Sequence, residues 1–161
     1  MSEQGTRRFR RAITYGTFDL LHYGHLNLLR RIADLADEVV VGVSTDGFND
    51  IKGKRSMTPF EHRAELVGAL RMVHSVIPEE SWDQKRRDIV EHGVDLFVMG
   101  DDWVGKFDDL ADVCEVMYLP RTSGISSTML RDAVHLISSD EIDRVLELLK
   151  SVADVLRPFG E

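Results

Sequence analysis

Short apolar runs alternate with longer helix-like stretches along most of this chain, and this alternation is the feature that most constrains its fold. Runs rich in β-branched and aromatic residues predict strands at residues 12–15, 39–44, 75–77, 96–99 and 116–119. Most of these runs are unbroken, as is typical of strands covered on both faces. Repeated strand–helix order requires crossover connections, so the sequence predicts an α/β fold with a parallel sheet.

Two segments carry helix-start signals. Residues 58–61 and 81–84 have the form of capping boxes, in which a hydroxyl residue is followed three positions later by Glu or Gln. The first predicted helix has Pro59 at its first position and runs to about Met72. The second is expected to end near Gly93, because glycine readily adopts the left-handed conformation that stops a helix.

The ends of the chain are expected to lie outside a nucleotide-binding domain at residues 12–135. Residues 1–11 are predicted to be a flexible tail, and residues 138–158 an added amphipathic helix capped by Ser138 and Glu141. The apolar positions of that helix are Ile142, Val145, Leu146, Leu149, Val152, Ala153 and Leu156. This face packs either on the domain's own core or on a second subunit, and both interpretations stay open.

Composition excludes several classes of protein. The 161 residues include 20 Lys and Arg against 28 Asp and Glu, a formal net charge of −8, which argues against a nucleic-acid-coating surface. The single cysteine, Cys114, excludes an internal disulfide and a Cys-rich metal site. No apolar run is long enough for a membrane helix, and the first residues lack the apolar core of a signal peptide. We therefore expect a cytoplasmic protein without membrane insertion.

The segment from Tyr15 to His25 (YGTFDLLHYGH) leads from the first predicted strand into a helix. The carboxyl end of a parallel strand is where open α/β sheets bind ligands, and a helix start there suits a phosphate. His22 and His25 are three residues apart, so their side chains are expected to project toward one point, and Gly24 leaves room for close approach. Such a pair can also be structural or half of a metal site. HExxH, Walker A and G-x-G-x-x-G motifs are absent.

A second segment of the same form, residues 121–128 (RTSGISST), follows the fifth predicted strand. Arg121 offers a bidentate guanidinium, and the three hydroxyl residues Ser126, Ser127 and Thr128 can cap a helix or bind phosphate oxygens. By itself this segment is an ordinary helix cap. Two such helix starts on one sheet, one with paired histidines, favour a triphosphate-binding site.

These motifs resemble the HxGH cytidylyltransferases, and among them the glycerol-3-phosphate cytidylyltransferases. The likeness covers roughly residues 12 to 130 and includes residues 44–46, 61–63, 76–79, 98–103 and 105–107. The resemblance implies a Rossmann-like doubly wound sheet of five parallel strands in the order 3-2-1-4-5, with helices on both faces. The family's closing hydroxyl run usually reads Ser-Thr-Thr, where this chain has Ser126-Ser127-Thr128, and its compact members lack the helix at 142–156.

The resemblance also implies an activity and the residues that serve it. Family members join CTP to sn-glycerol 3-phosphate with Mg²⁺, and His22 and His25 would be the catalytic residues. The residues expected to bind the nucleotide are Thr17, Phe18, His22, Tyr23, Gly24, His25, Arg71, Arg121, Thr122, Ser123, Gly124, Ile125, Ser126, Ser127 and Thr128. Lys52 and Lys85 would bind glycerol phosphate. We expect cytosine selectivity to come from residues 100–103 together with the backbone around Arg121 and Thr122. We expect the protein to be a homodimer. We expect its product to be an activated glycerol used for wall or capsule polymers.

Asp19 has two open interpretations, as a cap of the histidine-bearing helix or as a Mg²⁺ ligand. The function has alternatives as well. The same chemistry could join CTP to another phosphorylated alcohol or a phosphonate, or join ATP to a flavin as FAD synthetases do. A nucleotide-binding regulatory protein without turnover is a third hypothesis, and the intact histidine pair argues against it.

Overall fold

The computed structural model describes residues 9–138 and 140–156, with side chains described for residues 9–135 and 142–150. Its strands are β1 (Phe9–Gly16), β2 (Ala36–Ser44), β3 (Ser75–Glu79), β4 (Leu96–Gly100) and β5 (Glu115–Leu119). Each contains one of the predicted runs. Because β1 begins at Phe9, the last residues of the predicted tail 1–11 belong to the sheet, and residues 1–8 lie outside the described residues.

The strands form one parallel sheet in the order β3-β2-β1-β4-β5, which confirms the predicted topology. The register pairs Gly16 with Val43, Ser44 with Glu79, and Gly100 with Leu119. The carboxyl ends of all five strands therefore lie along one rim of the sheet, where ligands bind in open α/β folds.

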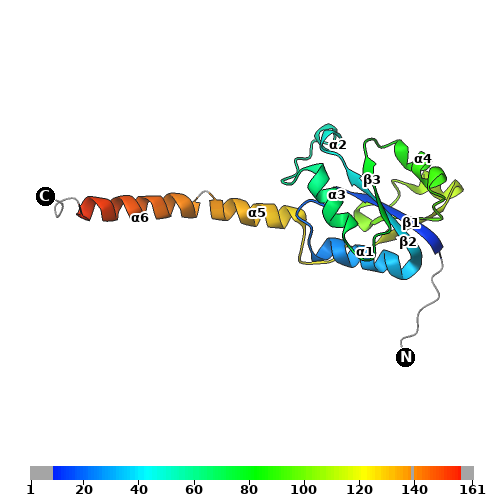
Figure 1. Cartoon of the computed structure of the whole chain (residues 1–161), viewed down its shortest axis with the longest axis horizontal. Coiled ribbons are helices and arrows are strands. Elements are labelled where there is room, and N and C mark those ends of the chain that lie inside the picture. The colour runs from blue at the N-terminus through cyan, green and yellow to red at the C-terminus, as the bar shows by residue number, and fades with distance from the viewer. Residues whose placement is uncertain (1–8, 139, 157–161) are drawn as a thin grey trace, which may run out of the picture. The chain divides into compact units, whose positions relative to one another are not determined.

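Helical segments connect the strands (Figure 1). They are α1 (Tyr23–Leu35), α2 (Asp46–Ile51), α3 (Phe60–Gly68), α4 (Gln84–Glu91) and the 3₁₀ turns η1 (Asp101–Trp103) and η2 (Asp108–Asp112). Alternate strand residues face opposite sides of the sheet, so the domain has two cores. Ala12, Val39 and Leu96 pack with Leu29 of α1 and Val67 of α3. Their neighbours Ile13, Val40 and Phe97 pack with Ile89 of α4 and Leu110 of η2.

Of the two predicted capping boxes, the second forms in part, since the Ser81 amide donates to Oε1 of Gln84 at 3.0 Å, although Asp83 is the N-cap of α4. The first is wrong in detail. Pro59 is the N-cap of α3 rather than its first helical residue, and the helix ends at Gly68, before the predicted Met72. Thr58 does not cap the helix because its hydroxyl donates to Asp19 Oδ1 instead. The predicted end near Gly93 is confirmed, since Gly93 has a φ of 59°.

The chain divides into two compact units, residues 1–125 and 126–161, so the first unit ends ten residues before the predicted domain boundary at 135. The second unit contains α5 (Ser127–Ser138) and α6 (Asp140–Leu156). The side chains of the predicted cap, Ser138 and Glu141, lie outside the described side chains.

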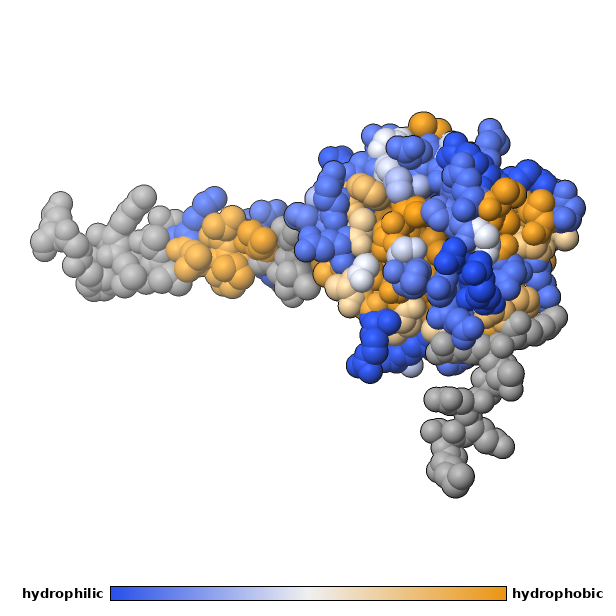
Figure 2. Space-filling view, turned by 45° about the vertical axis from the view of Figure 1, so that its right-hand side comes forward, coloured by the Kyte–Doolittle hydropathy of each residue, from blue (hydrophilic) through white to orange (hydrophobic). Residues whose placement is uncertain are grey.

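The described apolar side chains of α6 are about half exposed or more. They are Ile142, Val145, Leu146, Leu148 and Leu149. Hydrophobic residues also gather on the described surface of the C-terminal helices in Figure 2. Among the described residues, no helix combines the length and the apolar character needed to cross a membrane.

Candidate active site

The loop that follows β1 adopts a conformation that the sequence does not predict. Phe18 and Leu20 have φ angles of 53° and 49°, in the left-handed region that non-glycine residues rarely occupy. Phe18 is buried, and its ring lies 5.2 Å from that of His25 between centroids. Backbone strain of this kind persists only where surrounding contacts enforce it, and it clusters at functional sites.

His22 and His25 meet at the start of α1, as the sequence predicts. His22 is the N-cap, and its Nδ1 accepts a hydrogen bond from the Gly24 amide at 3.0 Å. The His22 amide donates in turn to Nδ1 of His25 at 3.3 Å. The two rings are stacked with their centroids 3.9 Å apart. The pair forms a reciprocal capping box made of two imidazoles.

This arrangement sets the protonation of both rings. Because each Nδ1 accepts a backbone hydrogen bond, the neutral tautomer of each ring carries its proton on Nε2. Burial, followed by the charge of neighbouring Arg121, lowers the pKa of His22. Burial also lowers the pKa of His25 to about 4, with further contributions from His22 and Arg121. Near neutral pH the site therefore presents two neutral Nε2–H donors.

Gly24 is required by the histidine pair itself. A Cβ atom there would lie 2.8 Å from Cε1 of His22 and 3.3 Å from Cγ2 of Ile125. The first approach is shorter than real Cβ atoms show, and the second would require Ile125 to shift by a few tenths of an ångström. The predicted reason for a glycine at this position, close approach of a phosphate, stays a prediction. The His22 ring by itself leaves no room for a side chain there. Tyr23, the first residue of α1, is exposed.

The segment that follows β5 is bound to α1. Nδ2 of Asn27 donates to Oγ1 of Thr122 at 2.8 Å, and Arg31 donates to the carbonyl oxygen of Pro120 at 2.7 Å. With the Ile125 contact at Gly24, these bonds place residues 120–125 beside the histidine turn. Arg121, Ser123 and Gly124 are exposed. The sequence correctly predicts that the two turns share a rim.

The hydroxyl residues at the end of this segment belong to the second compact unit. Oγ of Ser126 accepts a hydrogen bond from the Met129 amide, which is the capping interaction expected of a hydroxyl at a helix start. Ser127 and Thr128 are the first two residues of that helix, α5. Their predicted phosphate contacts stay predictions.

Lys52 and Lys85 come together, although they are 33 positions apart in the sequence. Their ammonium groups share the carboxylate of Glu79, at 3.8 Å from Lys52 and 2.6 Å from Lys85. Lys52 also donates to Oγ of Ser44 at 2.8 Å. Sequence reasoning missed Glu79 and Ser44. Their position could have identified them, because each is the last residue of its strand and so lies at the rim of the sheet.

The sequence does not predict the structural role of Arg63, which is fully buried. Its guanidinium donates to the carbonyl oxygens of Thr17, Ser44 and Thr58 at 2.6 to 2.9 Å and pairs with Asp46 at 2.6 Å. Arg63 therefore ties the residues that follow β1 and β2 to the loop before α3.

Asp19 has a structural role that neither predicted interpretation anticipates. Its carboxylate accepts hydrogen bonds from the amides of Met57 and Thr58 and from the Thr58 hydroxyl, at 2.8 to 3.1 Å. The cap of α1 is His22, so the prediction that Asp19 caps this helix is wrong. These bonds do not test the interpretation of Asp19 as a Mg²⁺ ligand, which stays a prediction. Within the described residues, no group of three His, Cys, Asp or Glu is arranged for a metal ion.

Arg71 is the predicted nucleotide-binding residue that the fold does not bring to the rim. It is exposed in the connection from α3 to β3, which enters the sheet at the amino end of β3. The rim lies at the opposite, carboxyl end of that strand. The loop predicted to select cytosine does reach the second turn, because Asp102 lies 3.7 Å from Arg121.

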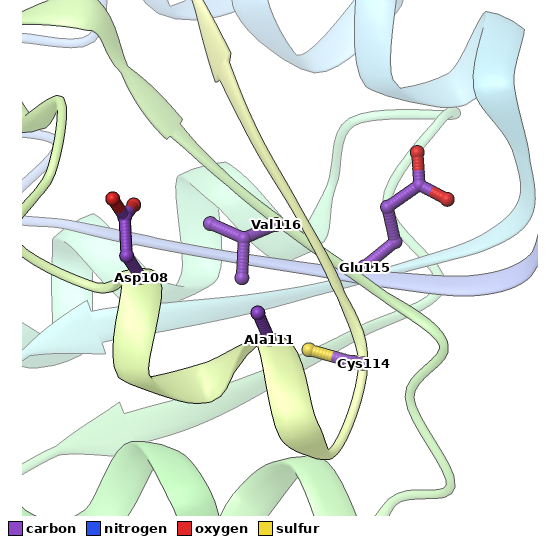
Figure 3. A pocket seen from close by; sticks show the side chains of 5 residues that line it. All are labelled: Asp108, Ala111, Cys114, Glu115 and Val116. Atoms are coloured by element: carbon purple, nitrogen blue, oxygen red, sulfur yellow. The ribbon is translucent and has the colours of Figure 1, made fainter.

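A pocket of about 570 Å³ lies elsewhere, at the start of β5 (Figure 3). Its lining residues are Asp108, Ala111, Cys114, Glu115 and Val116. Burial raises the pKa of the Cys114 thiol, which keeps it in its less reactive protonated form. The pocket shares no residue with the predicted site.

Relatives of high sequence identity match most of this chain. The chain is 54% identical over 125 residues to the glycerol-3-phosphate cytidylyltransferase of Bacillus subtilis, covering 78% of this chain and 97% of that protein. The enzyme of the same name from Staphylococcus aureus is 51% identical over 126 residues, covering 78% of this chain and 96% of the relative.

A solved structure supports the fold. The lipopolysaccharide core biosynthesis protein of Thermoplasma volcanium superposes with a TM-score of 0.62 at 24% identity, covering 71% of this chain and 99% of that one. At that identity the likeness concerns the fold alone. The cytidylyltransferase-like family description matches residues 13–133, which include the histidine turn and the segment after β5. The resemblance identified from the sequence is therefore confirmed, and the chain belongs to the cytidylyltransferase-like family.

Proposed function

We propose that this protein transfers the cytidylyl group of CTP to sn-glycerol 3-phosphate, giving CDP-glycerol and pyrophosphate. The observation that carries the proposal is the stacked histidine pair, whose two Nε2–H groups are left free to donate at the carboxyl end of β1. The Bacillus subtilis and Staphylococcus aureus relatives, which carry this enzyme name at 51% identity or more, support the choice of substrates.

The proposed reaction is an in-line displacement at the α-phosphorus of CTP. An oxygen of the acceptor phosphate forms the new bond to that phosphorus, and the bond to the pyrophosphate oxygen breaks. The acceptor is already an anion, so no strong general base is needed. What the protein must supply is positioning and stabilisation of the charge that develops on the phosphate oxygens.

In this proposal His22 and His25 are the catalytic residues. Their neutral Nε2–H groups donate to the CTP phosphates and to the departing pyrophosphate. Fixed donors aimed at developing charge need no reorganisation during the reaction, and this is the usual source of such catalysis. Thr17, Phe18, Tyr23 and Gly24 would line the nucleotide site around the pair, and residues 121–128 would hold the outer phosphates.

Lys52 and Lys85 are proposed to bind the acceptor phosphate. Two ammonium groups share one carboxylate, so the cluster carries a residual positive charge at the rim. We also propose a Mg²⁺ requirement, in which the ion shields the phosphate charge of CTP. Asp19 stays the candidate ligand for this ion, and the loop at 57–58 would hold its carboxylate in place.

The direct test is to incubate the protein with CTP, Mg²⁺ and glycerol 3-phosphate and to identify the product by mass. We expect CDP-glycerol and an equal amount of pyrophosphate. Parallel reactions contain ATP with a flavin mononucleotide, or CTP with other phosphorylated alcohols or a phosphonate. Turnover of ATP and the flavin without turnover of CTP would refute the proposal, and absence of turnover with every pair would favour a regulatory protein.

We further propose that the protein is a cytoplasmic homodimer whose product serves wall or capsule polymers. The substrates are charged phosphate compounds, which do not cross membranes unaided, and this supports the cytoplasm. The exposed apolar residues of α6 support self-association, because large exposed apolar faces mark interaction surfaces.

A further inference from the structure

Glu79 is a buried carboxylate at a rim that is expected to bind anions. It is the last residue of β3, and its side chain is 4% exposed. A carboxylate in such a place costs free energy unless it is paired, and it repels an incoming phosphate. Its presence therefore requires an explanation from its contacts.

Each oxygen of Glu79 holds one of the two lysines. Oε1 accepts a hydrogen bond from Lys85 at 2.6 Å. Oε2 accepts one from the Ser44 hydroxyl at 2.5 Å, and that hydroxyl accepts one from Lys52 at 2.8 Å. One carboxylate thus links the ends of β2 and β3 with lysines from α4 and from the C-terminal cap of α2.

Aromatic rings surround the same two ammonium groups. Lys85 Nζ lies 4.6 Å from the ring centroid of Tyr15 and 4.9 Å from that of Trp82. Lys52 Nζ lies 4.4 Å from the ring of Phe48. Rings attract the ammonium groups through their faces but do not fix a direction as a hydrogen bond does. The carboxylate and the Ser44 hydroxyl are therefore the groups that orient both lysines.

We propose that Glu79 is a positioning residue of the acceptor site, which holds Lys52 and Lys85 so that both ammonium groups meet one phosphate. This inference rests on the proposed function, because it takes the acceptor phosphate to bind these lysines. Glu79 itself does not touch the substrate. It sets the place of the two cations and keeps Lys52 charged.

The electrostatic surroundings of Lys52 make this role measurable. Burial lowers the pKa of Lys52 to about 8, and Glu79 is the group that opposes this shift. The positive charges of Lys54, Lys85 and Arg63 act in the same direction as burial. Without the Glu79 charge, Lys52 is expected to lose its proton at a lower pH, and binding of the acceptor phosphate should weaken over the same range.

The test compares Glu79→Gln with Glu80→Gln, an exposed neighbour that undergoes the same chemical change. Carbon-13 NMR of labelled lysine follows the titration of Lys52, which Lys52→Met assigns. We expect Glu79→Gln to move the Lys52 midpoint below the wild-type value and to raise the KM for glycerol 3-phosphate by about tenfold or more at pH 8. The KM for CTP should change by no more than about twofold. Glu80→Gln should match wild type in all three measurements.

Several outcomes would overturn the role of Glu79. They are an unchanged Lys52 midpoint in Glu79→Gln, an unchanged KM for glycerol 3-phosphate, or equal rises in both KM values. If Glu79→Gln does not fold, Ser44→Ala removes the link to Lys52 and should raise the same KM selectively; an equal effect on both substrates would count against the proposal. The NMR titration needs no activity, so a wild-type protein that makes no CDP-glycerol refutes the proposed function separately.

Discussion

His22 and His25 cap one helix reciprocally, each accepting a backbone hydrogen bond at Nδ1, with their rings stacked 3.9 Å apart between centroids. The helix start is thus built from the same two side chains that are proposed to perform catalysis. These hydrogen bonds fix both rings before any substrate binds. It also means that a substitution at either position affects the local fold as well as the chemistry.

Replacing His25 by alanine should separate binding from turnover. The variant loses one Nε2–H donor that acts on developing charge, and such a loss typically costs about 10² to 10³ in rate. CTP affinity should stay within about tenfold of wild type, because the other phosphate contacts remain. Steady-state kinetics with glycerol 3-phosphate and equilibrium binding of CTP measure the two quantities.

His62→Ala is the matched control, because His62 is exposed on α3 and remote in sequence from the pair. It should leave both kcat and CTP affinity at the wild-type level. Unchanged turnover in His25→Ala would remove His25 from the mechanism.

The buried His25 ring should also make stability depend on pH. Its pKa falls to about 4 in the folded protein, from about 6.5 in the unfolded chain. Between these values the unfolded chain binds a proton that the folded protein does not. The free energy of unfolding contributed by this group is therefore complete above pH 6.5 and declines as pH falls toward 4.

Chemical denaturation at several pH values between 4 and 7 measures this slope. His25→Asn keeps an acceptor near the Nδ1 position and cannot titrate, so its free energy of unfolding should vary less over this range. Equal slopes for the two proteins would show that His25 titrates normally in the folded state.

Arg63 should be among the side chains on which stability depends most. Replacing it with methionine removes the guanidinium that donates to three carbonyl oxygens, and a buried acceptor left unpaired costs about 1 to 3 kcal/mol each. Asp46 loses its ion pair but keeps the bonds from Phe60 and Ser56. We expect Arg63→Met to lower the free energy of unfolding by about 3 kcal/mol or more in urea denaturation. Arg55→Met, at an exposed position, should change it by less than about 0.5 kcal/mol, and a similar small effect at Arg63 would contradict the assigned role.

Much of the fold could be predicted because it follows from local patterns. Unbroken apolar runs identify strands such as β2 and β4 whatever surrounds them, since both of their faces are buried. Helix starts were predicted less well. Thr58 matches a capping box, but a partner 39 positions away in the sequence, Asp19, takes its hydroxyl, and no local pattern contains that contact.

The residues of the candidate site also fall into two groups, those that a local pattern predicts and those whose roles depend on contacts between distant parts of the chain. His22 and His25 were found because their spacing places them on one helix turn. The sequence does not predict the roles of Glu79 and Arg63, because each joins residues from several strands and loops and these contacts exist only in the folded chain. Arg71 is the opposite case, a residue assigned to the nucleotide site by resemblance alone. The fold of this chain places it at the amino end of β3, away from the rim.

The last prediction concerns α6, which lies beyond residues 13–133, the part of the chain that matches the family. Helices of this length are only marginally stable without packing partners, and this one exposes Ile142, Val145, Leu146 and Leu149. If the face binds a second copy, a chain ending at His135 should be monomeric where the full chain is dimeric. Replacing Leu146 and Leu149 together by glutamate should have the same effect, because it places charge in the apolar face. Glu147→Lys, on the polar face, should leave the dimer intact. Analytical ultracentrifugation measures all four proteins, and a shortened chain that remains dimeric would place the dimer interface outside α6.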